Sequence, residues 1–462
     1  MNNVAKNLLA LLLGILCVVF LVMRGWISEK LVWVLLGGIC ILIFMLQKQF
    51  RRNLLIISIL GFLTGWRGIN ISSSFIVYPT ELFLWLGLLV FLIDQLSGRM
   101  DVHPPRPMLL EIILLVFAVL GGITALFFGR PLLDILATLK SFLVFIPMLV
   151  LFRSWIQDKH QVVFYARLLI VVGMIISMLG LLERYVPQIA AIFPNYMYAP
   201  TENRINFEFG TAIQLAGFSS WGTPVVSTLL VLLSGLAIFI PKPQKGWQKY
   251  GWFFVLPVLI LGIISSGYRS AWLGLVPVII LGMVLNGVQV LPWIASATAG
   301  SLVLFSSTFI DRFRTVLFVK NSRDPSVLTR SLALQNGLLT IKSNFFFGTG
   351  WNSPTAFNDW INVGVYMGGL GLLVFVTWYG WLLIKLFGFA RKAKSTDAFL
   401  LHMSFITALV GYSIAMFSGA MSQIFPIMTG FWFVFCLGWR LVEISHEEEL
   451  INGEAVSLAT NL

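Results

Sequence analysis

Residues 265–280 read SSGYRSAWLGLVPVII, and they place one charged residue, Arg269, at the mouth of a long apolar segment. The apolar part belongs to a predicted span over residues 270–287. An α-helix rises about 1.5 Å per residue, so about 20 apolar residues cross the roughly 30 Å hydrocarbon core of a bilayer. Because lipid offers the backbone no hydrogen-bond partners, such a segment folds as a helix. The stretch therefore predicts a membrane-spanning helix that begins at an arginine.

Apolar runs of similar length recur along the whole chain. Hydrophobic residues account for 58% of its 462 residues and charged residues for only 11%, a balance that a soluble fold does not have. We therefore predict an all-α, polytopic transmembrane helix bundle of about 14 spans, in the range of roughly 12 to 14. The predicted spans are residues 7–23, 31–47, 54–66, 79–94, 109–127, 134–152, 162–182, 222–240, 251–266, 270–287, 289–308, 361–386, 398–418 and 424–441.

The first apolar run and the polar C-terminus set the limits of the predicted membrane domain. The run after Lys6 lacks a small-residue cleavage site, and more spans follow it. We therefore interpret it as a retained helix and not as a signal peptide. A single integral membrane domain is predicted over residues 1–442. It is followed by a polar tail over residues 443–462, which we expect to be disordered.

Basic clusters predict the orientation of the chain. The sequences QKQFRR, LSGRM, RSWIQDKH, PKPQKGWQK and RKAK fall in alternate loops, and basic loops of bacterial membrane proteins face the cytoplasm. Both termini are then inside, and the expected location is the bacterial cytoplasmic membrane. The same bias explains the net charge of +12 better than nucleic-acid binding does.

Cysteine and histidine placement argues against a metal site or a cofactor. Cys17, Cys40 and Cys436 each lie in an apolar run, and no CxxC pair occurs, so we expect neither a structural disulfide nor a redox role. The four histidines all fall on the predicted inner side of the membrane: His103, His160, His402 and His446. The predicted outer face therefore has no imidazole base and no histidine-based zinc site.

Two predicted outer segments, about 183–221 and about 309–360, are too long to be simple turns. Segments of this length without a core of their own are usually functional. The second is rich in cations, against the inside bias of basic residues, which long loops can escape. It holds Arg312, Arg314, Lys320, Arg323, Arg330 and Lys342 against Asp311 and Asp324. The alternative explanation of this excess is an anionic ligand.

A helix is predicted over residues 326–342 of the second outer segment. Asp324 is a good capping residue and Pro325 suits a first helical turn, which places Arg330 about one turn into the helix. The sequence FFFGTGWN follows at residues 345–352. Its aromatic residues suit a membrane interface, and Gly348 and Gly350 permit a tight turn. The GTG alone is a weak phosphate-binding signature.

For three basic residues, the position in the sequence can be explained either by a structural role or by ligand binding. Arg269 either snorkels to lipid headgroups or binds an anion at the outer surface, for which a guanidinium group is well suited. Lys140 lies within a predicted span and is a candidate functional cation, although a buried partner such as Asp134 explains it as well. Arg204 lies one turn from Glu208 if the segment is helical, and the two then pair.

A general base on the outer face would be a carboxylate or would come from the substrate itself. Each carboxylate of the predicted outer face also suits an ion pair or a helix cap. These residues are Glu202, Glu208, Asp311, Asp324 and Asp359.

Three motifs follow one another between about residues 262 and 375. They are GYRSAWLGL (267–275), RDPSVLTRSLALQNGLLTIKSNFFFGTGWNS (323–353) and NDWINVGVYMGGLGLLVF (358–375). Their order, and the spans before them, resemble the O-antigen polymerase and O-antigen ligase superfamily. That superfamily has an arginine at a span mouth, then a second arginine before a helix and a G-x-G, then a glycine-rich start of the next span. The resemblance covers about a quarter of the chain.

The resemblance implies a metal-independent membrane glycosyltransferase whose donor is a polyprenyl-diphosphate-linked glycan. By position, Arg269 and Arg330 correspond to the essential arginines of the family, which bind the diphosphate and stabilise it as a leaving group. We predict Asp359 as a weak catalytic base. The predicted substrate-binding residues are Arg204, Arg312, Arg314, Arg323, Lys140, Asn358, Gly348 and Gly350.

One departure from the family pattern bears on the reaction. Ligases of the family have a histidine before the asparagine that precedes the glycine-rich helix, and here Phe357 stands in its place, while Asn358 is kept. We therefore expect a polymerase of undecaprenyl-diphosphate-linked repeat units, for O-antigen, capsule or exopolysaccharide. The alternative within the family is a ligase that transfers the glycan to a lipid acceptor.

A transporter or flippase is the alternative from another class. It would spread charge through many spans and use paired broken helices, whereas here the unusual charge gathers on the outer segments. A peptidoglycan-type glycan polymerase shares the chemistry, but its motifs are not seen. Expected partners are the undecaprenyl-diphosphate-linked glycan, a glycan acceptor, membrane lipid, a flippase and a chain-length regulator, and no nucleic acid.

Overall fold

The computed structural model describes residues 50–64, 69–70, 76–97, 107–185, 223–243, 247–265, 268–286, 292, 295, 325–353, 358–417 and 425–460. Within these ranges the regular structure is helical, apart from a short ladder in which β1 (Ile69–Asn70) pairs antiparallel with β2 (Ile76–Val77). The predicted all-α class is thus confirmed for the described part of the chain. The predicted spans at 7–23 and 31–47, and nearly all of 289–308, lie outside it.

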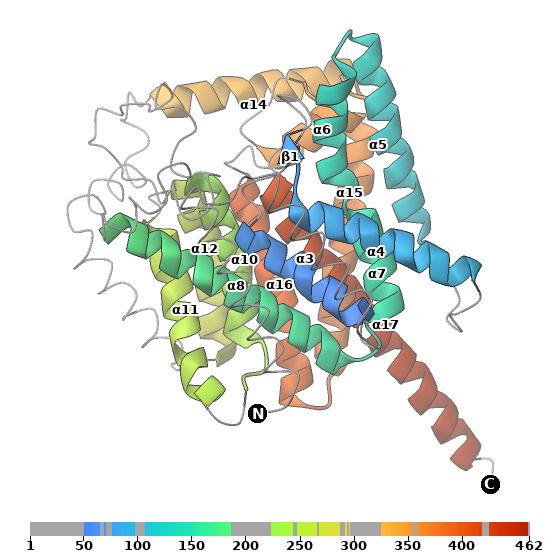
Figure 1. The fold of residues 1–462 in the computed structure, drawn as a ribbon, viewed down its shortest axis with the longest axis vertical. Helices are drawn as coiled ribbons and strands as arrows, with labels where there is room; N and C mark the ends of the chain where they lie inside the picture. The colour runs from blue at the N-terminus through green and yellow to red at the C-terminus, as the bar shows by residue number, and fades with distance from the viewer. Residues whose placement is uncertain are drawn as a thin grey trace, which may run out of the picture.

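The described helices pack as a bundle with one helix, α14, lying across its end (Figure 1). Their bounds are α3 (Phe50–Thr64), α4 (Pro79–Leu96), α5 (Leu109–Phe127), α6 (Leu132–Leu143), α7 (Phe145–Trp155), α8 (Lys159–Tyr185), α10 (Thr223–Phe239), α11 (Trp247–Ser265), α12 (Arg269–Asn286), α14 (Pro325–Ser343), α15 (Asp359–Lys392), α16 (Thr396–Met416) and α17 (Phe425–Thr460).

Six helical stretches of the described chain are long and apolar enough to cross a membrane: Pro79–Leu96, Leu109–Phe127, Leu132–Trp155, Lys159–Leu182, Asp359–Lys392 and Thr396–Met416. A membrane protein is therefore supported by the structure. The expected total of about 14 spans is not confirmed, because the six stretches are all that meet this criterion among the described residues.

The predicted span over residues 134–152 consists of two helices, α6 and α7, which meet at Val144. Pro147 explains the junction. Proline has no N–H to donate to the carbonyl of Leu143, and its ring collides with that carbonyl in a continuous helix. The chain keeps its direction across the junction, so the two helices still form one apolar stretch from Leu132 to Trp155.

The polar tail is helical, and our expectation of disorder was wrong. α17 continues without interruption from the bundle to Thr460, and its last turns project from the bundle (Figure 1). Glutamates of the tail pair with basic residues from other helices. Lys159 pairs with Glu448 at 2.5 Å, and Lys392 pairs with Glu449 at 3.2 Å.

These pairs belong to one end of the bundle, which we call the basic end. Arg51 at the start of α3 pairs with Asp94 near the end of α4 at 3.0 Å, and Arg167 of α8 donates to the carbonyl of Pro241 after α10. We assigned these basic clusters to alternate loops. Those of their residues that the structure describes lie at the same end of the bundle. We call the opposite end, where α14 lies, the α14 end.

A buried ion cluster joins three helices near the basic end. Both terminal nitrogens of Arg153 on α7 donate to Glu111 of α5, at 2.7 and 2.8 Å, and its Nε donates to Glu443 of α17 at 2.6 Å. The Arg153 side chain is only 7% exposed. A bidentate arginine–carboxylate pair with a second acceptor satisfies a guanidinium group that would otherwise be costly to bury.

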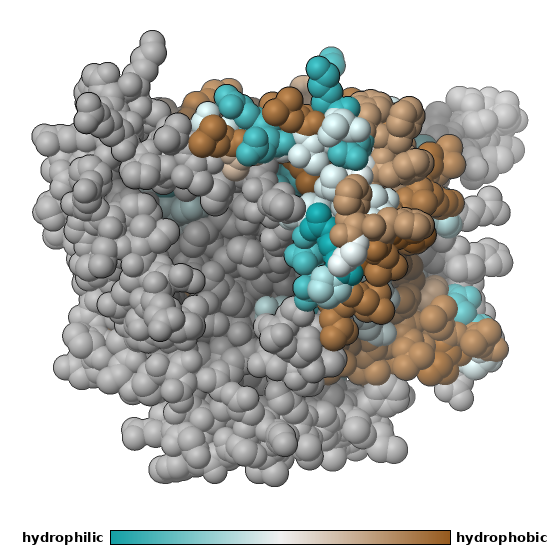
Figure 2. Space-filling model, turned by 90° about the horizontal axis from the view of Figure 1, so that it is seen from above, coloured by the Kyte–Doolittle hydropathy of each residue, from teal (hydrophilic) through white to brown (hydrophobic). Residues whose placement is uncertain are grey.

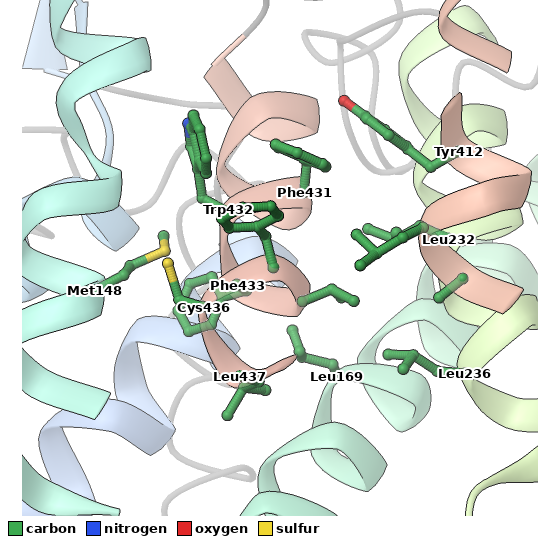
Figure 3. Packing of buried hydrophobic residues seen from close by; sticks show 14 of the residues in the cluster. Met148, Leu169, Leu232, Leu236, Tyr412, Phe431, Trp432, Phe433, Cys436 and Leu437 are labelled. Atoms are coloured by element: carbon green, nitrogen blue, oxygen red, sulfur yellow. The ribbon is translucent and has the colours of Figure 1, made fainter. Parts of the chain in front are cut away.

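Aromatic side chains fill the centre of the bundle. Trp432 of α17 is fully buried and lies within 5.8 Å, between ring centroids, of Phe142, Phe145 and Trp378. Figure 3 shows the neighbouring apolar residues closing around this part of α17 from several helices. The packing encloses α17 on several sides, so this helix forms the axis of the described bundle.

We expect Arg153→Met to destabilise the protein by about 3 to 5 kcal/mol, because it leaves Glu111 and Glu443 without their buried counter-ion. The measurement is the free energy of unfolding in mixed detergent micelles. Lys392→Gln is the matched control, since it removes an exposed pair worth about 0 to 1 kcal/mol. Equal losses in the two variants would contradict a special role for the buried cluster.

Candidate functional site

The start of α15 is fastened to the end of α16 at the α14 end. The Asn358 side chain caps α15 by accepting from the N–H of Ile361 at 3.1 Å, and its amide nitrogen donates to the carbonyl of Phe417, also at 3.1 Å. The indole of Trp360 donates to the carbonyl of Ser413 at 3.3 Å. Asn358, a predicted substrate-binding residue, is therefore buried and engaged through both atoms of its amide.

Asp359 is the first residue of α15, and its side chain is fully buried. A carboxylate in this position is favoured by the partial positive charge of a helix N-terminus. From α16, the phenol of Tyr412 interacts electrostatically with this carboxylate. The predicted base thus lies inside the bundle, next to the capped start of α15.

Arg269 begins α12 and is partly buried. The indole of Trp272 donates to the carbonyl of Ile263 at 3.1 Å and fixes the connection from α11. Further along α12, a Cβ built on Gly274 would lie 2.6 Å from the carbonyl oxygen of Gly411. The start of α12 therefore runs beside the end of α16, and Arg269 lies five residues, or about 7.5 Å of helix, from that contact.

Arg330 lies on α14, which spans Pro325–Ser343 and confirms the helix predicted over 326–342. α14 lies across the end of the bundle near α5, α6 and α15 (Figure 1). Its last turns pack on α15, where a Cβ built on Gly364 would lie 2.5 Å from the side chain of Ile341. Arg269, the helix that carries Arg330, and Asp359 thus belong to the same end of the bundle.

Several predicted cations of the two long segments are outside the described residues. This applies to the predicted substrate-binding residues Arg204, Arg312, Arg314 and Arg323, and also to Phe357. Their assignments stay predictions.

The turn after α14 is built into the bundle by its backbone. The N–H of Thr349 donates to the carbonyl of Val365 at 2.8 Å, and the N–H of Leu370 donates to the carbonyl of Phe345 at 3.3 Å. On the other side, Trp351 makes two hydrogen bonds to α5. Its backbone N–H donates to the carbonyl of Gly121, and its indole N–H donates to the carbonyl of Ala118 at 2.7 Å. Residues 345–351 therefore form a wedge between α5 and α15.

Gly348 and Gly350 make this wedge possible. Their φ angles are 68° and 84°, in the left-handed region that favours glycine. A Cβ on Gly350 would lie 2.3 Å from the backbone nitrogen of Ala125 in α5. The predicted tight turn is confirmed, and both glycines have a structural role that does not depend on a ligand.

α15 is interrupted opposite the wedge. Gly368 has φ 79° and ψ 171°, which separates a short first part of α15 from its long second part. A break in a spanning helix exposes backbone groups that must find other partners. Residues 345–349 supply them, through the bonds to Val365 and Leu370. Broken helices are also found in transporters, but this break is filled by the protein itself.

Lys140 pairs with Glu81, and not with Asp134. Its ammonium group lies 2.8 and 2.6 Å from the two carboxylate oxygens of Glu81 in the first turn of α4. The ammonium group also lies 5.1 Å from the ring centroid of Tyr78. Burial, and then the Glu81 carboxylate, raise the pKa of Tyr78 to about 12, so the neutral phenol is not the counter-ion of Lys140 and the Glu81 carboxylate is. The charge of Lys140 is therefore balanced within the protein.

Sequence reasoning missed Arg130 and Glu81. Arg130 lies in the connection between α5 and α6, and its Nη1 donates to the carbonyl of Asn352, the residue that follows the wedge. The signal was the same as for Arg269, a single arginine in a short connection between two apolar runs. Glu81 could have been found as a carboxylate in the first turn of a predicted span.

Among the described residues, no three histidine, cysteine, aspartate or glutamate side chains gather closely enough to hold a metal ion. Comparison of the sequence with models of known protein families finds no matching family, and comparison with curated proteins finds no matching protein. The resemblance stated above and the roles that it implies therefore stay predictions, and the site is argued from its residues.

We expect Gly350→Ala to lower stability by about 2 kcal/mol or more, because the left-handed φ and the contact with α5 both exclude a methyl group. Gly388→Ala in α15 is the control, since a Cβ there meets no atom within 4 Å and alanine favours a helix. Thermal unfolding in detergent, followed by size-exclusion chromatography, measures both. A Gly350→Ala variant as stable as the control would show that the wedge does not hold α5 and α15 together.

Proposed function

We propose that this protein is a polymerase of lipid-linked oligosaccharide repeat units at the outer face of the bacterial cytoplasmic membrane. Its donor would be a glycan attached to a polyprenyl diphosphate, of the undecaprenyl type. The acceptor would be a second lipid-linked glycan. The observation that carries the proposal is the placement of Arg269, α14 and the start of α15 at one end of the bundle.

The distribution of charge supports the sidedness of this proposal. The described residues of the basic clusters lie at the end of the bundle opposite α14, and basic loops face the cytoplasm. The α14 end then faces outward. Arginines at the outward end run against this general bias and are suited to a phosphorylated ligand, because a guanidinium group binds phosphate through paired hydrogen bonds.

In the proposed reaction, a hydroxyl of the acceptor glycan attacks the anomeric carbon of the donor sugar. The bond between that carbon and the diphosphate oxygen breaks, and the diphosphate leaves with the electron pair. Negative charge therefore grows on the leaving group in the transition state. Arg269 and Arg330 would stabilise this charge close to lipid, where electrostatic interactions are stronger than in water.

The hydroxyl proton must also be removed as the new glycosidic bond forms. We propose Asp359 for this role. Because its carboxylate is fully buried, it reaches a hydroxyl only if the acceptor enters the bundle beside Asn358. A structural role as a buried charge in the first turn of α15 is the alternative, and the Asp359→Asn variant distinguishes the two.

The pairing of charges within the spans argues against a transporter. Lys140 is balanced by Glu81 and Arg153 by Glu111 and Glu443, so these in-span charges hold helices together and do not line a path. The break in α15 is closed by the wedge. Arg269 lies at the α14 end, at the start of α12 and outside the span interior, and Arg330 lies on α14, which favours chemistry at the membrane surface.

We expect Arg269→Ala and Arg330→Ala each to lower turnover by about 100-fold or more, the usual effect of losing a group that stabilises transition-state charge. The assay incubates purified protein in lipid nanodiscs with lipid-diphosphate oligosaccharide alone and measures chain length. Arg391→Ala, an exposed arginine at the basic end, is the control with the same change of charge and should be fully active.

Normal activity in both variants would overturn the site assignment. Absence of longer chains with the wild-type protein, together with transfer of the glycan to an added lipid acceptor, would instead favour the ligase.

Asp359→Asn should lower turnover while donor binding persists, because the proton acceptor is lost and the phosphate-binding arginines remain. Turnover and donor affinity are measured on the same preparation, and its thermal unfolding temperature should match that of the wild type. Turnover equal to that of the wild type would remove Asp359 from the proposed role.

A further inference from the structure

A row of exposed apolar side chains runs along the end of α14 and into the turn after it. We call it the ridge, and it consists of Leu338, Leu339, Phe345, Phe346 and Phe347. Leu339 is 63% and Phe346 62% exposed, and the other three are exposed to a similar degree. The three phenylalanine rings contact one another in sequence, at centroid distances of 5.8 and 6.3 Å.

The ridge is held rigidly and does not belong to a loose loop. The carbonyl of Phe345 accepts from Leu370, the N–H of Gly348 donates to Asn344, and Thr349 binds Val365. A fixed backbone therefore presents these rings to the outside. Exposed apolar area is unfavourable in water, and contiguous patches of this kind mark interaction surfaces.

The ridge continues the surface of the bundle that faces lipid. Phe345 lies against α15, where a Cβ built on Gly369 would lie 2.4 Å from its ring, and Leu373, one turn further along α15, is exposed. Phe127 at the end of α5 is 87% exposed. α5 and α15 are both long and apolar enough to cross a membrane, so their exposed apolar side chains at this end face lipid.

Figure 2 shows this end of the molecule from above. Among the described residues, hydrophobic and hydrophilic side chains alternate on this end, and the adjoining flank is mostly hydrophobic. Lys342, between the leucines and the phenylalanines of the ridge, is exposed. A lysine next to exposed leucine and phenylalanine side chains is typical of a helix that lies in the interfacial layer of a membrane.

We propose that the ridge inserts into the interfacial layer of the bilayer, so that α14 lies on the membrane surface with its last turn at the depth of the lipid headgroups. The occupant of this surface is the lipid leaflet itself. Apolar contact with acyl chains removes the ridge from water, and Lys342 meets the headgroup phosphates. The inference rests on the contacts of the ridge and is independent of the proposed reaction.

The test uses spin labels on the full-length protein. The native cysteines Cys17, Cys40 and Cys436 are replaced by alanine, and a nitroxide is attached to Phe346→Cys or, separately, to Leu339→Cys. The protein is placed in vesicles of phosphatidylethanolamine and phosphatidylglycerol. Accessibility to oxygen, which concentrates in lipid, is compared with accessibility to a water-soluble nickel chelate. Ile384→Cys on the exposed face of α15 is the lipid control, and Arg391→Cys at the basic end is the aqueous control.

We expect the ratio of oxygen to nickel accessibility at both ridge positions to lie well above that of Arg391→Cys and toward that of Ile384→Cys, which lies deeper in the membrane. A ratio close to that of Arg391→Cys would overturn the proposal, because the ridge would then face water. Low accessibility to both reagents would overturn it as well, since the ridge would then be covered by protein. Two ridge positions on different elements guard against a local disturbance by one label.

Discussion

The fold depends on the hydrogen bonds that residues 345–351 make with α5 and α15. A helix that breaks inside a membrane leaves backbone N–H and C=O groups without hydrogen-bond partners. Each unsatisfied group costs roughly several kcal/mol of stability. The wedge supplies those partners to Val365 and Leu370, and it also binds Gly121 of α5. One short segment thereby joins a surface helix to two helices of the bundle, and it does so with backbone atoms, which substitutions change least.

Buried ionised side chains need partners for the same reason as buried backbone groups. Within the described bundle, Arg153 and Lys140 each lie against a carboxylate from a distant part of the chain, because a single buried ion is far more costly than a pair. The two clusters lie toward opposite ends of the bundle and tie different helices together. Charge inside the described part of this membrane protein is therefore a means of holding neighbouring helices together.

The sequence predicted some of these features well and missed others for physical reasons. The bounds of α5 were predicted because an uninterrupted apolar run over residues 109–127 sets both ends of the helix. α14 was predicted from the capping sequence at Asp324 and Pro325. The helical tail was missed because composition does not reveal partners such as Lys159. Glu81 lies 59 residues from Lys140, and no local pattern connects them. For the candidate site, the sequence indicated Arg269 and Asp359 but not the burial of the latter.

α17 is longer than a membrane is thick. Its 36 residues amount to about 54 Å of helix, well beyond the roughly 30 Å of a hydrocarbon core. The part around Trp432 is clamped in the middle of the molecule, and the far end stands clear of it (Figure 1). A stiff rod anchored at one end behaves as a lever, so a small tilt among the packed aromatic rings becomes a much wider swing at the C-terminal tip.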